Sequence, residues 1–563
     1  MRLANPLLAL TAALLTALPA HAAAPEDRTA TLQTPKQTTA STLQVYSRET
    51  VVDVTVTDNK GQPVHGLTQA DFSVKEDGKP QTIHSFKEAG SANRGAVRVL
   101  PKLPEGVYSN AEEAPPSGPV HIILLDLLNT PDPAQMVIVK RGVANHLKAM
   151  RPGTQVAVFE LSSNKGLSLL QGFTSDGVLA AASAERLDVE WVRPPKELVQ
   201  SAAMTFEAMQ HLGAYVSGIK GRKDLLWFTA YMPILLTRDG GSTLRPEPPF
   251  PLSYKEVSEL YEALAGEQVA VYPIDAGGLS SGIGTVPSGT GVGMGRDLAT
   301  NRSMAAYQLG SGVREKEMLE VADQTGGLML DNSSDFNSLL GRAIEHGSNY
   351  YTLSYVPPPF TNDTRYHTID VKVDRPGLHL VYRKGYNAVD PSNPSPAPGP
   401  KLMQAAMGGG VPPATQLLFD VRVGHSTELA KPTDPPVMGA LDPRLKKAVL
   451  SRYSFLYLLP MSQISFADGP DGTHSGSLEF DVAAYDADGK LATMISQTMK
   501  LPLTADEYQQ FVKTPFQFLQ QLDLPPGQMT LRIGILDGVS NKVGTLEIPL
   551  TVGKGPAVVE AGR

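Results

Sequence analysis

The stretch HIILLDLLNT, residues 121–130, places four consecutive apolar residues directly before an aspartate, with a threonine four positions later. A continuous apolar run is typical of a strand that is buried on both faces, as the strands of a parallel sheet are. In an open α/β sheet, ligands bind beyond the carboxyl ends of the strands. Asp126 therefore either caps the turn into the next helix or forms part of a binding site.

Similar apolar runs alternate with helical stretches from residue 118 to residue 350. The strands are expected at 120–126, 154–161, 166–173, 223–229, 269–275 and 327–331. The helices are expected near 132–150, 177–187, 196–219, 253–267, 313–325 and 334–347. This alternation predicts a Rossmann-like α/β domain with a doubly wound, mostly parallel sheet.

The chain on either side of this domain is β-rich. Residues 44–90, with alternating valines at 52, 54 and 56, predict a small β-module. Residues 350–386 are expected to form a β-strand extension that packs with this module. A Pro/Gly-rich linker is predicted at 387–414 and a sandwich-like β-domain at 415–553, while residues 90–117 have no clear period and are interpreted as a connection.

Composition excludes several classes of protein. The chain has 563 residues, a net charge of −8 and no cysteine, so disulfides, thiolate metal sites and cysteine nucleophiles are absent. It contains no run rich in lysine and arginine, and nucleic-acid binding is therefore not expected.

The amino-terminal residues indicate export. Residues 1–22 combine Arg2, a short apolar stretch and the sequence Ala-His-Ala at 20–22, which together are typical of a cleaved secretory signal peptide. Residues 23–43 are polar and threonine-rich and predict a flexible leader. No other run has the length that a membrane span needs, so the expected location is periplasmic or extracellular.

The segment that ends in Asp126 resembles the von Willebrand factor type A (VWA) family, whose first strand leads into an Asp-x-Ser-x-Ser metal-ion-dependent adhesion site. The resemblance implies that Asp126, Thr130 and Thr174 are ligands of a Mg²⁺ ion. Leu128 stands where the family has its first serine, and Ala230 stands where it has its final aspartate. The implied site is incomplete, or degenerate, at these two positions.

Two other readings of this site remain open. Asn129 and Asp176 are nearby oxygen donors that could compensate for the lost ligands. Alternatively, Asp126, Asn129 and Thr130 only cap the next helix and close the strand–helix turn.

The wider resemblance covers residues 44–386 and, more loosely, the chain to residue 553. It is carried by VVDVTVTDNKGQPVHGLTQADFSVKEDGKPQTIHSF, LLDLLNT, YPIDAGGL and YYTLSYVPP, and with these segments the chain looks like VWA-related proteins of the acidobacterial type. It implies a fold and export but no substrate.

The sequence contains none of the motifs that mark common enzymes: no G-x-S-x-G, no phosphate-binding loop and no H-E-x-x-H. His346 and His367 stand alone and are interpreted as structural or surface residues, and Tyr350, Tyr351 and Tyr355 as part of a half-buried sheet. The glycine-rich residues 277–295 are expected to form a mobile loop at the same edge as Asp126.

We therefore expect an exported, non-enzymatic protein that binds a protein partner at the carboxyl edge of its α/β sheet. One alternative is a structural role in the cell envelope through the β-sandwiches. A second alternative is a hydrolase whose site matches no recognisable motif.

Overall fold

The computed structural model describes residues 49–90, 103–110, 119–130, 132–189, 198–219, 221–232, 254–277, 311–331, 333–357, 366–387, 399–409, 411–425, 450–469 and 472–553. The predicted signal peptide, the leader, Trp191 and most of the glycine-rich loop lie outside these residues. Within them, no helix is long and apolar enough to cross a membrane.

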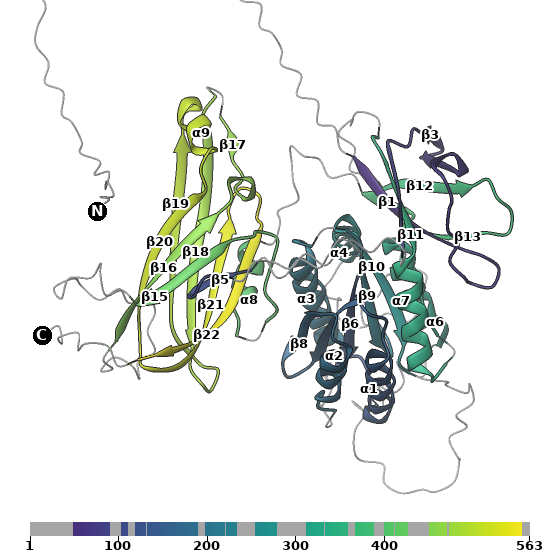
Figure 1. Cartoon of the computed structure of the whole chain (residues 1–563), viewed down its shortest axis with the longest axis horizontal. Coiled ribbons are helices and arrows are strands. Elements are labelled where there is room, and N and C mark those ends of the chain that lie inside the picture. Colours follow the sequence, from purple (N-terminus) through teal and green to yellow (C-terminus); the bar gives the residue numbers. More distant parts are fainter. Residues whose placement is uncertain are drawn as a thin grey trace, which may run out of the picture. The chain divides into compact units, whose positions relative to one another are not determined.

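The α/β domain is built on one sheet with the strand order β10-β9-β6-β7-β8 (Figure 1). Its strands are β6 (Val120–Asp126), β7 (Gln155–Ser162), β8 (Gly166–Thr174), β9 (Lys223–Thr229) and β10 (Val269–Asp275). β6, β7, β9 and β10 are parallel, whereas β8 runs antiparallel to β7 at one edge. The sheet is therefore mixed, and the strand predicted at 327–331 is reduced to a single bridge between Leu330 and Ile274.

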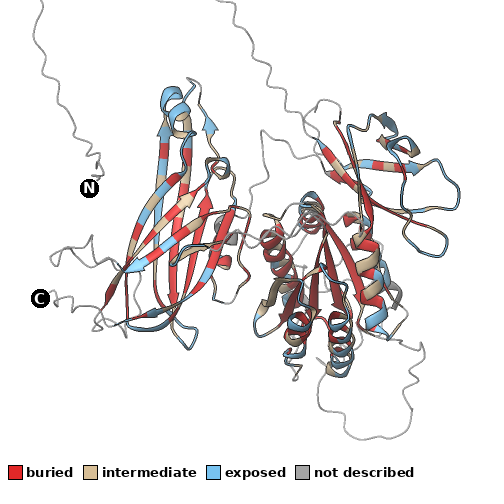
Figure 2. Cartoon of the chain, in the orientation of Figure 1, coloured by how far each residue is buried: buried red, intermediate tan, exposed pale blue. Residues whose placement is uncertain are grey.

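Helices cover both faces of this sheet, which makes the fold doubly wound. The helices are α1 (Pro133–Lys148), α2 (Gly177–Glu185), α3 (Leu198–Val216), α4 (Tyr254–Gly266), α6 (Ser311–Thr325) and α7 (Phe336–Ser348). Ile122 and Leu124 pack in the core with α3, α4 and α6, and Ile123 and Leu125 pack with α1, α2 and α7. β6 is buried along its whole length, and the inner strands of this sheet are red in Figure 2. Two opposite apolar faces explain the continuous apolar run in the sequence.

The first β-rich part is assembled from two distant segments. Its strands are β1 (Thr50–Thr57), β2 (Phe72–Glu76), β3 (Lys79–Gln81), β4 (Ser85–Ala89), β11 (Tyr350–Tyr355), β12 (Tyr366–Val373), β13 (His379–Val381) and β14 (Gly385–Asn387). β11 pairs with both β1 and β4, and β12 pairs with β2. Tyr350, Tyr351 and Tyr355 are all buried.

The second β-rich part has two sheets that share one hydrophobic core. Its strands are β15 (Asp420–His425), β16 (Ser451–Leu459), β17 (Ala467–Asp468), β18 (His474–Tyr485), β19 (Leu491–Leu503), β20 (Phe516–Leu524), β21 (Gly527–Asp537) and β22 (Val543–Val552). The stretch 505–522 contains the short helix α9 (Ala505–Phe511) and most of β20.

Two segments that were interpreted as connections belong to this second part. β5 (Val107–Ser109) pairs with β15, so the predicted connection at 90–117 contains a strand. The predicted linker at 387–414 contains helix α8 (Gly399–Ala406), and buried Arg532 donates to the carbonyl oxygens of Ala406 and Pro412 at 2.7 and 2.9 Å. Their short length and Pro/Gly-rich surroundings concealed both elements in the sequence.

Asn110 fixes β5 to this part of the chain. Its Nδ2 donates to the carbonyl oxygens of Ala414 and Leu417 at 3.0 and 2.8 Å, and its Oδ1 accepts from the backbone N–H of Phe419 at 2.8 Å. Asn110 is 1% exposed. It satisfies three buried backbone groups that water cannot reach.

Replacing Asn110 with alanine is expected to destabilise the β15 region by about 2 kcal/mol, because buried backbone groups lose their partners. Hydrogen–deuterium exchange of peptides from β15 and β16 measures this loss. Glu105→Ala, at an exposed position before β5, is the matched control. Equal exchange in the two variants would contradict the anchoring role of Asn110.

Candidate functional site

Asp126 is the last residue of β6, the strand that lies between β9 and β7 in the sheet. The backbone N–H groups of Leu127 and Leu128 then donate to the carbonyl oxygen of Leu161, at 2.9 and 3.1 Å. This turn points the side chain of Leu128 into the core, where it is 1% exposed. We call the carboxyl ends of these parallel strands the rim, defined by residues 126–130 at the end of β6, 162–165 at the end of β7 and 229–232 at the end of β9.

The carboxylate of Asp126 is completely buried and accepts three hydrogen bonds from N–H groups. The backbone N–H of Asn129 donates to Oδ1 at 2.9 Å. The Nδ2 of Asn129 and the indole Nε1 of Trp227 donate to Oδ2 at 2.8 and 2.9 Å. Donors to a carboxylate form strong, charge-assisted bonds, so the protein itself stabilises this buried group.

Asn129 links the strand end to helix α3. Its Nδ2 donates one hydrogen to Asp126 and the other to Thr205 Oγ1, at 3.0 Å. Thr205 in turn donates to the carbonyl oxygen of Ser201 at 2.8 Å. The Oδ1 of Asn129 is buried and has no hydrogen-bond partner among the described residues. The amide nitrogen therefore lies between a carboxylate oxygen and a hydroxyl oxygen, the two kinds of atom between which a cation would bind.

Thr130 also lies at the rim, but its hydroxyl is already in use. Its Oγ1 accepts from the backbone N–H of Ala230 at 3.2 Å, and its side chain is only 5% exposed. This bond joins the turn after β6 to the turn after β9. The structure thus brings Asp126 and Thr130 to one edge, as the sequence predicted.

Thr174 does not join them. Because β8 is antiparallel to β7, Thr174 lies level with Val156, which lies level with His121 at the start of β6. His121 is five residues before Asp126, or about 16 Å along the strand. Asp176 caps α2 at that far edge, where its carboxylate accepts from Val178 and Leu179. The predicted ligand set therefore does not assemble.

The hydroxyls that the sequence analysis missed are those of Ser201 and Thr205. Both are buried on α3, four residues apart. The sequence offered one indication of them, which is a pair of hydroxyl residues at positions i and i+4 on an otherwise apolar helix face.

These residues do not fit a divalent cation. The lone pairs that would bind a metal accept N–H groups instead, and Leu128 and Ala230 supply no side-chain oxygen. Mg²⁺ needs several oxygen ligands in an octahedral arrangement. Within the described ranges there is also no group of three or more His, Asp or Glu residues that could hold a metal.

Burial raises the pKa of Asp126 to about 6, although hydrogen bonds from Asn129, Trp227 and Thr229 act to lower it. The pKa of Tyr231, in the turn after β9, is raised to about 12 by burial and by the charge of Asp126. The rim therefore carries an acidic group that changes its charge not far below neutral pH.

We expect this raised pKa to make stability depend on pH. Between about pH 4 and 6 the folded chain binds more protons than the unfolded chain, so the free energy of unfolding falls as the pH rises through this window. A shift of the pKa from 3.8 to about 6 corresponds to about 3 kcal/mol. The measurement is urea unfolding of wild type and Asp126→Asn across pH 4–7.

In Asp126→Asn, the free energy of unfolding should no longer show the fall with rising pH that the titration of Asp126 causes. Asp481, whose pKa burial also raises to about 6, is present in both proteins and cancels in the comparison. Identical pH dependence in the two proteins would contradict a titrating Asp126.

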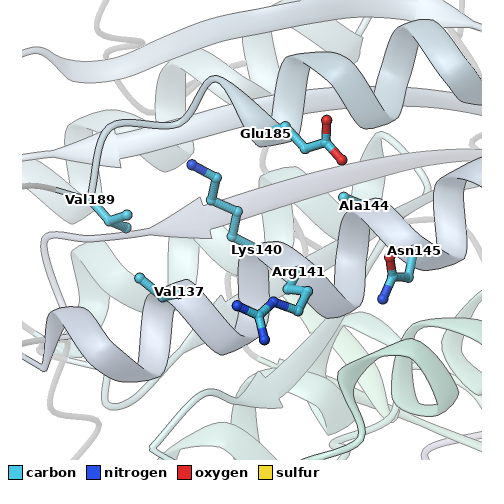
Figure 3. Close-up of a pocket in the computed structure, with 7 residues that line it drawn as sticks. All are labelled: Val137, Lys140, Arg141, Ala144, Asn145, Glu185 and Val189. Atoms are coloured by element: carbon cyan, nitrogen blue, oxygen red, sulfur yellow. The ribbon is translucent and has the colours of Figure 1, made fainter.

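A separate surface hollow of about 280 Å³ lies between α1 and the end of α2 (Figure 3). Figure 3 shows Lys140 and Arg141 projecting from α1 and Glu185 from the facing segment. Its lining residues are Val137, Lys140, Arg141, Ala144, Asn145, Glu185 and Val189. None of them belongs to the rim.

No protein-family model matches this chain, and no curated protein matches it in sequence. Solved structures resemble parts of it. An aerotolerance-related membrane protein from Bacteroides fragilis is 13% identical, with a TM-score of 0.25, over 40% of this chain and 98% of that chain. The SpRpn10 VWA domain is 12% identical, with a TM-score of 0.22, over 41% of this chain and 98% of that domain.

The manganese-loaded TRAP protein of Plasmodium vivax is 12% identical, with a TM-score of 0.23, over 50% of this chain and 97% of that chain. Identities and TM-scores this low carry no argument about function. The description of the fold rests on the sheet topology given above.

Proposed function

We propose that this chain is an exported binding protein with a VWA-like domain, which recognises a protein partner at the rim without needing a metal ion. The observation that carries the proposal is the hydrogen-bonded unit of Asp126, Asn129 and Thr205 at the carboxyl edge of a doubly wound sheet. That edge is where open α/β sheets bind their ligands.

The internal hydrogen bonds support the metal-free part of this proposal. An adhesion site that depends on a metal uses the ion to bridge the protein and an acidic group of its partner. Here the Asn129 amide holds the carboxylate and the α3 hydroxyl together. Partner contacts would then come from exposed rim residues such as Asn164, in the turn after β7.

Export and the architecture of the flanking parts belong to the same proposal. The sequence of residues 1–22 supports secretion, and the β-rich parts would be sandwich-type domains that frame the α/β domain. The rim is proposed as a binding site and not as a catalytic one. In the alternative structural role, the β-rich parts would make the envelope contacts.

The test is crosslinking of the full mature chain in its native envelope, followed by identification of the captured proteins. Asn164→Arg adds bulk and charge at the rim, and Ser175→Arg makes the same exposed change next to Thr174, at the opposite edge. We expect Asn164→Arg to reduce capture of the partner at least tenfold and Ser175→Arg to leave it unchanged.

Chelation provides the second arm of the experiment. EDTA should not change capture, and calorimetry should show no heat of binding for Mg²⁺ or Mn²⁺ at millimolar concentrations. Equal capture by both arginine variants would refute the rim as the contact surface. Loss of capture in EDTA would refute metal independence.

A further inference from the structure

A second polar cluster lies at the amino ends of the parallel strands, opposite the rim. His121 is the second residue of β6, and Asp224 is its direct partner on β9. Ser348 is the last residue of α7 and reaches the same place from the helix layer. His121 and Asp224 are 1% and 0% exposed, whereas Ser348 is partly exposed.

The three side chains form a chain of contacts from solvent into the core. Ser348 Oγ lies 3.2 Å from His121 Nε2, and His121 Nδ1 lies 3.1 Å from Asp224 Oδ2. The ring N–H does not point squarely at the carboxylate, so this second contact is a close approach rather than an aligned hydrogen bond. Catalytic hydrogen bonds are often poorly aligned before substrate binds.

The carboxylate decides the tautomer of the imidazole. A carboxylate only accepts, so the proton of a neutral His121 lies on Nδ1, and Nε2 is left with a lone pair that faces the hydroxyl of Ser348. Arg222 Nε donates to the other oxygen of Asp224 at 2.9 Å. Burial acts to raise the pKa of Asp224, but the nearby charge of Arg222, the contact with His121 and the hydrogen bond from Arg222 lower it overall. Asp224 is therefore ionised beside the ring.

Gly347 makes this approach of α7 possible. A Cβ at this position would lie 2.1 Å from Asp224 Oδ2, so any other residue would displace the helix end from the sheet. The backbone at Gly347 thus sets the position of the neighbouring Ser348 hydroxyl relative to His121.

From this geometry we propose that Ser348 is a nucleophile for acyl transfer, with His121 as its general base and Asp224 as the residue that orients the base. These are the roles of a serine hydrolase triad, which is recognised by geometry and not by position in the sequence. Because His121 and Asp224 are buried and Ser348 is partly exposed, the substrate class is a small carboxylic ester that approaches from outside. The site lies about 16 Å from the rim along β6 and is independent of it.

In the first half of the reaction, Ser348 Oγ attacks the ester carbonyl carbon while His121 Nε2 takes the hydroxyl proton. The bond to the leaving alcohol then breaks, and the alcohol leaves with that proton. Water next attacks the carbonyl carbon of the acyl-serine and gives one proton to His121. The bond to Ser348 Oγ then breaks, His121 gives that proton to Ser348 Oγ, and the carboxylic acid is released. One ester and one water give one acid and one alcohol.

The experiment is labelling of the full mature chain with a fluorophosphonate probe, followed by mass spectrometry, with hydrolysis of p-nitrophenyl acetate measured in parallel. We expect one label per chain on the peptide that contains Ser348, and loss of both label and hydrolysis in Ser348→Ala. Ser338→Ala, an exposed position on the same helix, should behave as wild type.

Asp224→Asn keeps the shape of the side chain and should slow labelling at least a hundredfold, because the imidazole loses the group that fixes its tautomer. Thermal melting curves separate this effect from misfolding. Absence of label at Ser348 in folded wild-type protein, or equal labelling rates in wild type and folded Asp224→Asn, would overturn the proposal and leave the three groups a packing role only.

Discussion

Replacing Arg222 with methionine is expected to lower the free energy of unfolding of the α/β domain by about 3–5 kcal/mol, because it leaves a buried carboxylate without its main partner. Arg222 is 2% exposed, and its guanidinium donates to Asp224, to the Tyr272 hydroxyl at 2.8 Å and to the carbonyl oxygen of Gly326 at 3.2 Å. Asp224 is fully buried and, among the described residues, would retain only the polar contact with His121.

Hydrogen–deuterium exchange of amides in β6, β9 and β10 measures this loss within the complete chain. The control is the double variant Arg222→Met/Asp224→Asn, which removes both charges. It should recover at least half of the lost protection, because most of the penalty comes from the uncompensated charge. If the double variant were no more stable than Arg222→Met, lost packing and not lost charge would explain the effect.

The second large effect is expected at Trp227. Trp227→Ala should lower the stability of the α/β domain by about 3–5 kcal/mol, because the indole is completely buried in the core that faces α3. Trp227→Phe keeps most of that volume and removes the N–H that donates to Asp126. It should cost about 1–3 kcal/mol, since a hydrogen bond to a charged group is lost.

Urea unfolding at pH 5 and pH 7 separates the two contributions. The penalty of Trp227→Phe should be larger at pH 7, where Asp126 is charged, than at pH 5, where it is mostly neutral. Trp227→Ala should keep a large packing penalty at both values. A penalty of Trp227→Phe that does not change with pH would show that the indole contributes only by packing.

The strands that could be predicted from the sequence are those buried on both faces. β6, β9 and β10 begin and end at the predicted residues, because a continuous apolar run between polar segments defines a central parallel strand. No comparable pattern in the sequence indicates whether an edge strand runs parallel or antiparallel to its neighbour. β8 begins at the predicted residue and is one residue longer than predicted, but its antiparallel direction places Thr174 at the wrong end of the sheet for the site to which it was assigned.

The rim could be predicted only in part for a related reason. Asp126 is the last residue of its strand and Thr130 comes four residues later, so their place at its carboxyl end follows from the strand itself. Thr205 and Trp227 meet them through packing between elements that are distant in the sequence. The cluster of His121, Asp224 and Ser348 is hidden in the same way, because it joins two strands and a helix without any local motif.

The pairing of β1 with β11 and of β5 with β15 has a consequence for the order in which this protein can fold. When the chain emerges amino end first during synthesis, the α/β domain has all its strands and helices once residue 348 has appeared. Both β-rich parts must still wait for partners from beyond residue 350. Their early strands remain unpaired edges until then, and such edges promote association with other chains. Chains that end prematurely after the α/β domain should therefore aggregate, even though that domain is complete.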